Sequence, residues 1–149
     1  MDNVNRFHTD ATWVLVRAEH LALVLVLSSL ALLHAREVSW GCFFAAFVAV
    51  DLVGYIPGAI AVRRANGGPI APLFHHLYNV SHCYLTAGIA VGLWALAARH
   101  LEWAMLALPI HLSGDRGLFG NTYKPVSLPF EPAAPLPEVR INRIQEVRK

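Results

Sequence analysis

The sequence predicts an all-α integral membrane protein, a four-helix transmembrane bundle of up-down topology followed by a Pro-rich C-terminal tail. Of its 149 residues, 56% are hydrophobic and only 15% are charged, a composition too apolar for an ordinary soluble domain of this length. Four apolar stretches each approach the roughly 20 residues needed to cross the hydrocarbon core. The polar links between them are short, and short links place successive helices antiparallel.

The expected elements follow from the positions of these stretches and links. An N-terminal segment is expected over residues 1–12, the transmembrane domain over 13–118 with spans at about 13–34, 38–62, 72–98 and 101–118, and the tail over 119–149. The fourth stretch is the weakest, because it loses apolar character after Leu112, so an early end as a broken or re-entrant helix is open. The tail has prolines at positions 129, 132, 135 and 137 and then turns charged, which indicates extended chain.

Lys and Arg are distributed unevenly between the two sides of the expected bundle. The N-terminus, the second link and the tail share one side, which carries Arg6, Arg63, Arg64, Lys124, Arg140, Arg143, Arg148 and Lys149. The opposite side carries Arg36 and Arg99 alone. Because cytoplasmic loops retain positive charge, we expect a multi-pass protein of the inner (cytoplasmic) membrane with both termini in the cytoplasm.

Other protein classes fit the sequence less well. A secretory signal over residues 1–36 is disfavoured, because its n-region would carry Asp2, Asp10 and Glu19, whereas such signals have a basic n-region. The formal net charge of +2 and the lack of a basic stripe argue against a nucleic-acid partner. Membrane lipids are the expected partners, and a homo-oligomer is open.

Each expected span contains polar residues, although ionisable groups cost roughly 2.5–3.5 kcal/mol each at the centre of a membrane helix. In chain order they are Arg17, Glu19 and His20, then Asp51, then His75, His76, Asn79 and His82, and finally His111, Asp115 and Arg116. Positions three, four or seven apart share a helix face, so each helix presents a polar stripe. At a rise of about 1.5 Å per residue the stripes converge on the cytoplasmic half, which predicts one polar cavity open to the cytoplasm.

Three kinds of chemistry suit such a cavity. The first is a metal site, since imidazoles and carboxylates from several helices bind Zn²⁺ or Fe; the candidate ligands are His82, His111, Asp115 and Asp51. The second is acid–base catalysis, for which the candidates are Glu19, Asp51 and Asp115, with Arg17, Tyr55, Asn79 and Arg116 as candidate substrate-binding residues. The third is a proton or ion relay. The same groups can instead be paired charges that only fix helix register.

The order of these motifs resembles a family of small bacterial membrane proteins known as domain of unknown function 4260. The matching pieces lie between residues 13 and 125; they are Arg17-Ala18-Glu19, Asp51 with Gly54-Tyr55, Tyr78 to His82, His111 to Arg116, and Phe119 to Pro125. This chain has His20 and Val50 where the family usually has Gly and Pro. The resemblance implies four helices and selects Glu19, Asp51, Asn79, His82, His111, Asp115 and Arg116 as site residues, but it assigns no activity.

Taken together, the sequence favours an intramembrane enzyme that uses the His/Asp/Glu cluster, by metal-assisted or acid–base chemistry, on a lipidic or small amphiphilic substrate. In this interpretation Arg17 and Arg116 hold an anionic head group. The alternative is a non-catalytic membrane subunit or an ion- or proton-conducting oligomer with a structural polar core. A conducting pore needs polar groups through both leaflets, and the outer half of the expected bundle is nearly bare of them.

Overall fold

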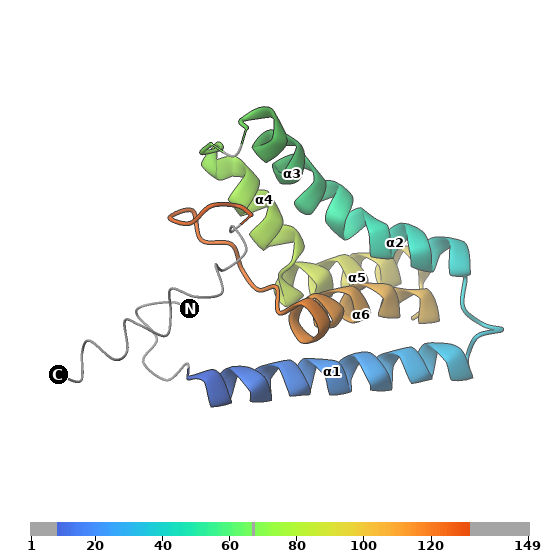
Figure 1. Cartoon of the computed structure of the whole chain (residues 1–149). Helices are drawn as coiled ribbons and strands as arrows, with labels where there is room; N and C mark the ends of the chain where they lie inside the picture. The colour runs from blue at the N-terminus through green and yellow to red at the C-terminus, as the bar shows by residue number, and fades with distance from the viewer. Residues whose placement is uncertain (1–8, 67, 132–149) are drawn as a thin grey trace.

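The structure is a computed structural model that describes residues 9–66 and 68–131, and all regular structure in these ranges is helical. The elements in chain order are α1 (Asp10–Leu33), α2 (Trp40–Val53), α3 (Tyr55–Arg64), α4 (Pro72–Ser81), α5 (Tyr84–Ala98), the 3₁₀ turn η1 (Trp103–Leu106), α6 (Ala107–Gly114) and the π-helical segment η2 (Asp115–Phe119). Figure 1 shows α1 running along one side of the molecule, α2 and α3 along the other, and α5 and α6 between them. The all-helical class expected from the sequence is therefore confirmed for the described residues.

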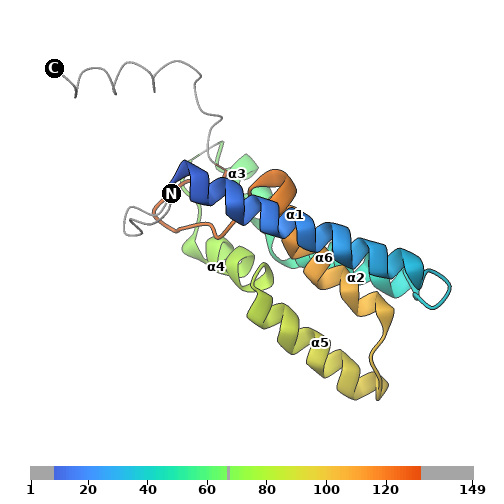
Figure 2. The same ribbon diagram turned by 90° about the horizontal axis from the view of Figure 1, so that it is seen from below.

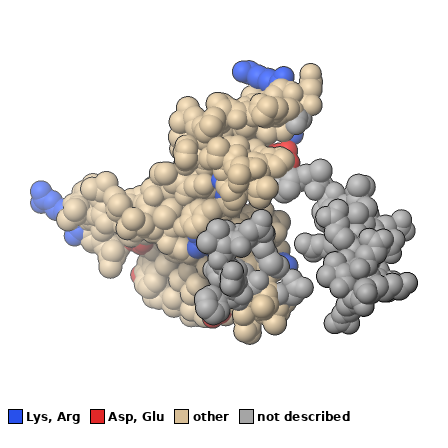
Figure 3. Space-filling view, turned by 90° about the vertical axis from the view of Figure 1, so that its left-hand side faces the viewer, with Lys and Arg blue, Asp and Glu red and all other residues tan. Residues whose placement is uncertain are grey.

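Two helical stretches are long and apolar enough to cross a membrane, Ala11–Leu33 and Trp40–Arg64. The second joins α2 and α3 into one span. A third span is reached if α4 and α5, which meet at a bend of 57°, are taken as one broken helix. The large apolar side chains of these helices point outward, as at Leu25 (69% exposed) and Leu32 (68% exposed), and the face seen in Figure 3 carries few charged atoms. Such continuous apolar surface is unusual for a soluble monomer and suits contact with lipid.

The fourth expected span, residues 101–118, is not among these candidate spans. It folds instead as η1, α6 and η2, and the eight residues of α6 cover only about 12 Å. This short helix lies at the centre of the molecule, in contact with α1, α2 and α5, and Ala107, Leu112 and Ser113 are almost fully buried. Because other helices surround it, its length is set by packing, and it need not match the thickness of the bilayer.

The chain returns to its starting side after α6. The guanidinium of Arg17, near the start of α1, donates hydrogen bonds from Nε to the carbonyl of Gly117 (3.1 Å) and from Nη2 to that of Leu118 (2.9 Å). The beginning of α1 and the end of η2 are thus joined, and the view from below shows α1 lying across α6 (Figure 2). The up-down four-helix order expected from the short links stays a prediction, because only two or three stretches of the described residues could cross a membrane.

Apolar packing concentrates at the end of the bundle where α1 meets α2. The end of α1, the α1–α2 turn, α2, η1 and α6 form one buried cluster there, made of Ala31, Val38, Phe43, Ala104 and Ala107. The turn is also tied to η1 by polar contacts, because Trp103 Nε1 donates to Glu37 Oε2 (3.0 Å) and the ring of His34 stacks on that of Trp103. None of the four candidate ligands belongs to this cluster.

The first part of the expected tail packs against the helices. Residues 120–131 contain no regular helix, but the Asn79 amide donates to the carbonyl of Lys124 (3.0 Å) and accepts from its N–H (2.7 Å). His75 Nε2 lies 3.1 Å from the carbonyl of Leu128, and Phe130 is 2% exposed. We call residues 123–131 the strap. Residues 1–8 of the expected N-terminal segment and 132–149 of the expected tail lie outside the described residues.

Close contact between η2 and α1 gives a test of this packing. A Cβ at Gly117 would lie 2.8 Å from the backbone N of Leu21, whereas a Cβ at Gly114 would meet nothing within 4 Å. We expect Gly117→Ala to push α1 away and to destabilise the protein by about 1–3 kcal/mol, as overpacking does, while Gly114→Ala is neutral or stabilising. Thermal unfolding of both variants in detergent measures the difference, and equal melting temperatures would contradict the close approach of α1 and η2.

Candidate metal centre

The four residues expected as ligands come from interruptions in the helices and from the central helix. Asp51 stands just before the junction of α2 and α3 at Gly54, His82 is the C-cap of α4, and Asp115 begins the π-helical segment. His111 lies on α6. Helix breaks of this kind free backbone and side-chain groups from regular helical geometry, and they recur at ligand and ion sites in membrane proteins.

Gly54 allows the two breaks to meet. A Cβ at this position would overlap Ser81 Oγ and lie 2.9 Å from His82 Cε1. The absence of a side chain therefore lets the end of α4 approach the α2–α3 junction, and this approach carries His82 to Asp51. Small residues serve the same purpose wherever membrane helices come into close contact.

Two imidazole nitrogens and two carboxylate oxygens converge at this point. His82 Nε2 lies 3.3 Å from Asp51 Oδ1 and 3.2 Å from Asp115 Oδ2. His111 Nε2 lies 3.7 Å from Asp51 Oδ1 and 3.9 Å from Asp115 Oδ2. The ligand atoms of Asp51, His82 and His111 all lie within 4.8 Å of one another, which makes these three a possible metal-binding group.

The opposite ring nitrogen of His82 is held by the end of α4. Nδ1 lies 3.0 Å from the carbonyl of Tyr78 and 2.9 Å from Ser81 Oγ. A carbonyl only accepts hydrogen bonds, so this contact places a proton on Nδ1. In the neutral ring Nε2 then carries the lone pair, and a ring N–H bonded to a backbone carbonyl is the usual arrangement of a metal-ligating histidine.

Neither histidine finishes its hydrogen bonding inside the protein. His82 Nε2 and both ring nitrogens of His111 are buried without a hydrogen-bond partner among the described residues, although carboxylate oxygens lie close to both Nε2 atoms. The lone pair of His82 Nε2 and the two carboxylates that it faces repel one another unless a proton or a metal ion lies between them. Neighbouring ligand atoms of a tetrahedral metal site are about 3.4 Å apart, and the four nitrogen–oxygen distances of 3.2–3.9 Å lie near this value. The residues whose ligand atoms are all close enough to share one metal ion are Asp51, His82 and His111.

Aromatic rings cover the two histidines, whereas the side chain of Asp51 is accessible to solvent. The ring of Tyr78 stacks on His82 with centroids 4.0 Å apart, and the edge of Phe47 meets His111 at 4.7 Å. The side chains of His82 and His111 are buried, whereas that of Asp51 is 41% exposed. Asp51 is therefore the most accessible of the four candidate ligands, followed by Asp115 at 17%.

Helix α1 does not contribute to this group, contrary to the expectation that all four polar stripes converge. Glu19 lies on the exposed face of α1, and His20 turns to Tyr84, whose hydroxyl lies 3.3 Å from His20 Nδ1 and 2.7 Å from Ser113 Oγ. The Nε and Nη2 atoms of Arg17 donate to the carbonyls of Gly117 and Leu118 in η2. The i,i+4 spacing rule places residues on one face of their own helix, but it does not say which neighbour that face meets.

Two further residues expected to bind substrate hold the strap. The amide of Asn79 donates to the carbonyl of Lys124 and accepts from its N–H. The hydroxyl of Tyr55 donates to Glu131 Oε1 (2.8 Å). His75, on the same stripe as Asn79, faces Leu128 and Phe130. Of the polar residues expected on the third span, only His82 lies at the candidate metal centre.

Arg116 is the one expected substrate-binding residue that lies at the centre. Its Nη2 donates to the carbonyl of His82 (3.2 Å), and its guanidinium lies 4.4 Å above the ring of Tyr84 and 5.5 Å from that of Tyr123. This contact ties the end of α4 to η2. The remaining donors of the guanidinium give the surroundings of Asp115 a positive group.

The sequence did not single out Tyr78 or Lys124. Tyr78 stands four residues before His82 and supplies both the stacked ring and the carbonyl that fixes the imidazole, so the i,i+4 spacing was a usable signal. Lys124 lies in irregular chain, and only the fold of the strap brings it near Tyr78. No spacing rule covers such a contact.

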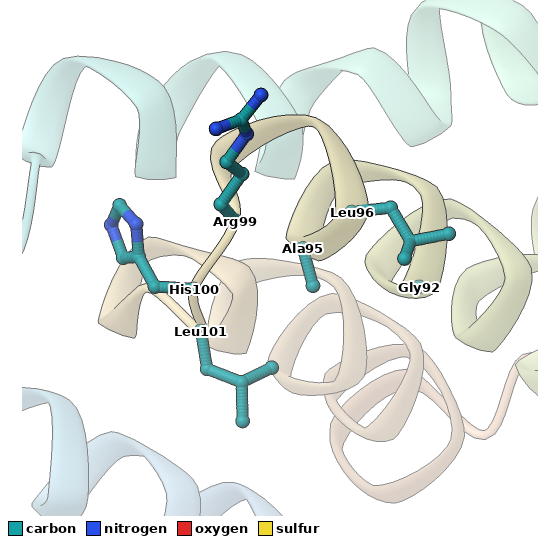
Figure 4. A pocket seen from close by; sticks show the side chains of 6 residues that line it. All are labelled: Gly92, Ala95, Leu96, Arg99, His100 and Leu101. Atoms are coloured by element: carbon teal, nitrogen blue, oxygen red, sulfur yellow. The ribbon is translucent and has the colours of Figure 1, made fainter.

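The surface grooves lie away from this centre. An open groove of about 580 Å³ at the end of α5 is lined by Gly92, Ala95, Leu96, Arg99, His100 and Leu101 (Figure 4). A second one, of about 670 Å³, lies between the end of α3 and the start of α4, around Arg64 and Phe74. Neither is lined by a candidate ligand, so the chemistry of the site rests on Asp51, His82, His111 and Asp115. No protein-family model, curated protein or solved structure matches the chain.

Proposed function

We propose that this chain is a metal-dependent membrane enzyme that acts on a lipidic or small amphiphilic substrate. Asp51, His82 and His111 would hold a divalent ion, Zn²⁺ or Fe, and Asp115 would complete the ligand set or act as the adjacent base. The proposal places the centre at the bundle's cytoplasmic side. Membership of the domain of unknown function 4260 family is part of the same proposal, because that resemblance selects these four residues.

One observation carries the proposal: two buried imidazole Nε2 atoms face two carboxylates without a hydrogen-bond partner. In a protein interior nearly all buried polar atoms are paired, so each exception needs a physical explanation. A divalent cation between these groups would satisfy all of them at once. A proton on His82 Nε2 would instead let that imidazole donate to the carboxylates. The Nε2 of His111 would still be without a hydrogen-bond partner.

The residues of the centre divide the chemistry among them. A divalent ion held there would supply a Lewis acid. Asp51, which is partly exposed, lies on the path by which substrate and water arrive. Asp115 contacts both imidazoles and can accept a proton from water or substrate during hydrolysis. Arg116 would hold an anionic group of the substrate, whereas Arg17 would act as a positioning residue that joins α1 to η2.

The apolar surroundings explain why an amphiphile is the proposed substrate. The centre lies at breaks in stretches that could cross a membrane, Trp40–Arg64 and the bent pair α4–α5. A substrate that partitions into the bilayer arrives along these apolar helices, and its polar head is then the part that meets Asp51 and Arg116. The competing function, a non-catalytic subunit with a structural polar core, requires the same residues to be satisfied without an ion.

Metal content distinguishes these functions. Elemental analysis of full-length protein, purified in detergent without chelators or a metal-affinity tag, should find about one Zn or Fe per chain. The His82→Ala, His111→Ala double variant and the isosteric Asp51→Asn variant should lose it, because the first removes two ligand atoms and the second removes the negative charge of the carboxylate. His76→Ala removes an exposed histidine of the same helix and should retain the metal, as should Glu19→Gln. Metal-free wild-type protein would overturn the proposal in favour of the structural polar core.

The orientation of the chain in the inner membrane is a second proposed property. Eight cationic residues stand on the expected cytoplasmic side and two on the other, and Arg17 joins the start of α1 to the end of η2. Both ends of the helical domain therefore belong on the cytoplasmic side.

Reporter fusions measure this orientation. Alkaline phosphatase fused after Lys149 should be inactive and green fluorescent protein at the same position should fluoresce, because the positive-inside rule retains that end in the cytoplasm. Phosphatase inserted between Arg36 and Glu37, in the opposite turn, should be active and serves as the control. An active phosphatase at Lys149 would contradict the orientation.

A further inference from the structure

The ammonium group of Lys124 lies in a cage of three aromatic rings. Its Nζ is 4.2 Å from the ring centroid of Phe130, 4.8 Å from that of Tyr78 and 5.4 Å from that of Tyr55. Within about 6 Å of a ring face a cation is attracted by the negative charge of the π system. Three rings around one ammonium therefore make a site that selects positive charge.

The rings hold this cation with little help from other groups. Nζ makes one hydrogen bond, to the carbonyl of Phe130, although an ammonium has three donors. No described carboxylate forms an ion pair with it, and burial lowers the pKa of Lys124, since desolvation penalises the charged form more than Glu131 and Asp115 favour it. The Lys124 side chain is thus a weakly tied occupant of the cage.

The walls of the cage are held mainly by contacts other than the single hydrogen bond from the Lys124 side chain to the carbonyl of Phe130. Tyr78 is 2% exposed and stacks on His82. Phe130 is equally buried and meets Tyr78 and His75 edge to face, and Tyr55 is fixed by its hydrogen bond to Glu131. Because Asn79 holds Lys124 by its backbone, the side chain can leave the cage while the strap stays in place.

We infer that Tyr55, Tyr78 and Phe130 form a binding site for the alkylammonium head group of an amphiphile, with Lys124 as its internal occupant. Aromatic cages of this kind are the usual way in which proteins bind quaternary ammonium groups. An incoming ammonium displaces one hydrogen bond and takes the same three rings. The Lys124 side chain then swings out toward solvent.

The cage shares a wall with the candidate metal centre, since Tyr78 stacks directly on His82. This inference rests on the proposed function only where it makes the bound amphiphile the substrate. An ammonium held by the cage would place the neighbouring part of its head group beside Asp51, the exposed member of the centre. The substrate class becomes an amphiphile with a positively charged amine near the bond that reacts.

Choline and its uncharged carbon isostere, 3,3-dimethylbutan-1-ol, test the cage directly. Titrated into full-length protein in detergent, choline should bind Lys124→Ala and Lys124→Ser about tenfold more tightly than wild type, because the cage is emptied. Its methyl proton resonances should shift upfield from the ring currents. The affinity for the uncharged isostere should be the same for these variants as for wild type. Lys124→Met keeps the stem in the cage and should show no gain, and the two smaller variants give independent chances of a folded protein.

Two comparisons decide the outcome. Adding Tyr55→Leu, a change at a partly exposed wall residue, should abolish the gain of Lys124→Ala; an undiminished gain would overturn the cage, as would equal gains for choline and its isostere. Choline binding by Lys124→Ala should persist when His111→Ala is added. The cage therefore stands or falls independently of the metal, whose own test is metal content.

Discussion

The close approach of two helix breaks is the contact on which the candidate centre depends. At Gly54 the α2–α3 junction has no side chain, and the end of α4 moves in against it. His82 thereby reaches Asp51 on one side and Asp115 on the other, and Arg116 fastens the break by bonding the carbonyl of His82. Without this approach His82 would not reach the other three groups, which His111 connects through its contacts with Asp51 and Asp115.

The distribution of polar groups follows from the two environments of such a chain. Ionisable side chains are costly against hydrocarbon, and the outward faces of α1 and α2–α3 accordingly carry apolar residues such as Leu25 and Leu52. The polar residues gather around α6, which other helices enclose. The ends of such a short helix can lie within the membrane region, because they are surrounded by neighbouring helices and not by lipid.

Two residues that share a polar helix face with the candidate ligand His82 contact the strap and not the candidate metal centre. His75 and Asn79 share a helix with His82, yet they hold residues 124 and 128. The strap in turn delivers Lys124 and Phe130 to Tyr78, the residue that orients His82. The proposed metal centre and the proposed ammonium site therefore share one residue, Tyr78.

The sequence by itself determined the helical class, the apolar stretches and the short links, and it selected Asp51, His82, His111 and Asp115 as candidate ligands. Composition and spacing report these properties because they depend on neighbours along the chain. Only the tertiary structure decided that α6 is a central helix, that Glu19 points outward, and that Tyr55 and Asn79 serve the strap. These outcomes depend on which faces meet across the bundle, and helical spacing fixes a residue's direction on its own helix but leaves its partner to the packing of all the others.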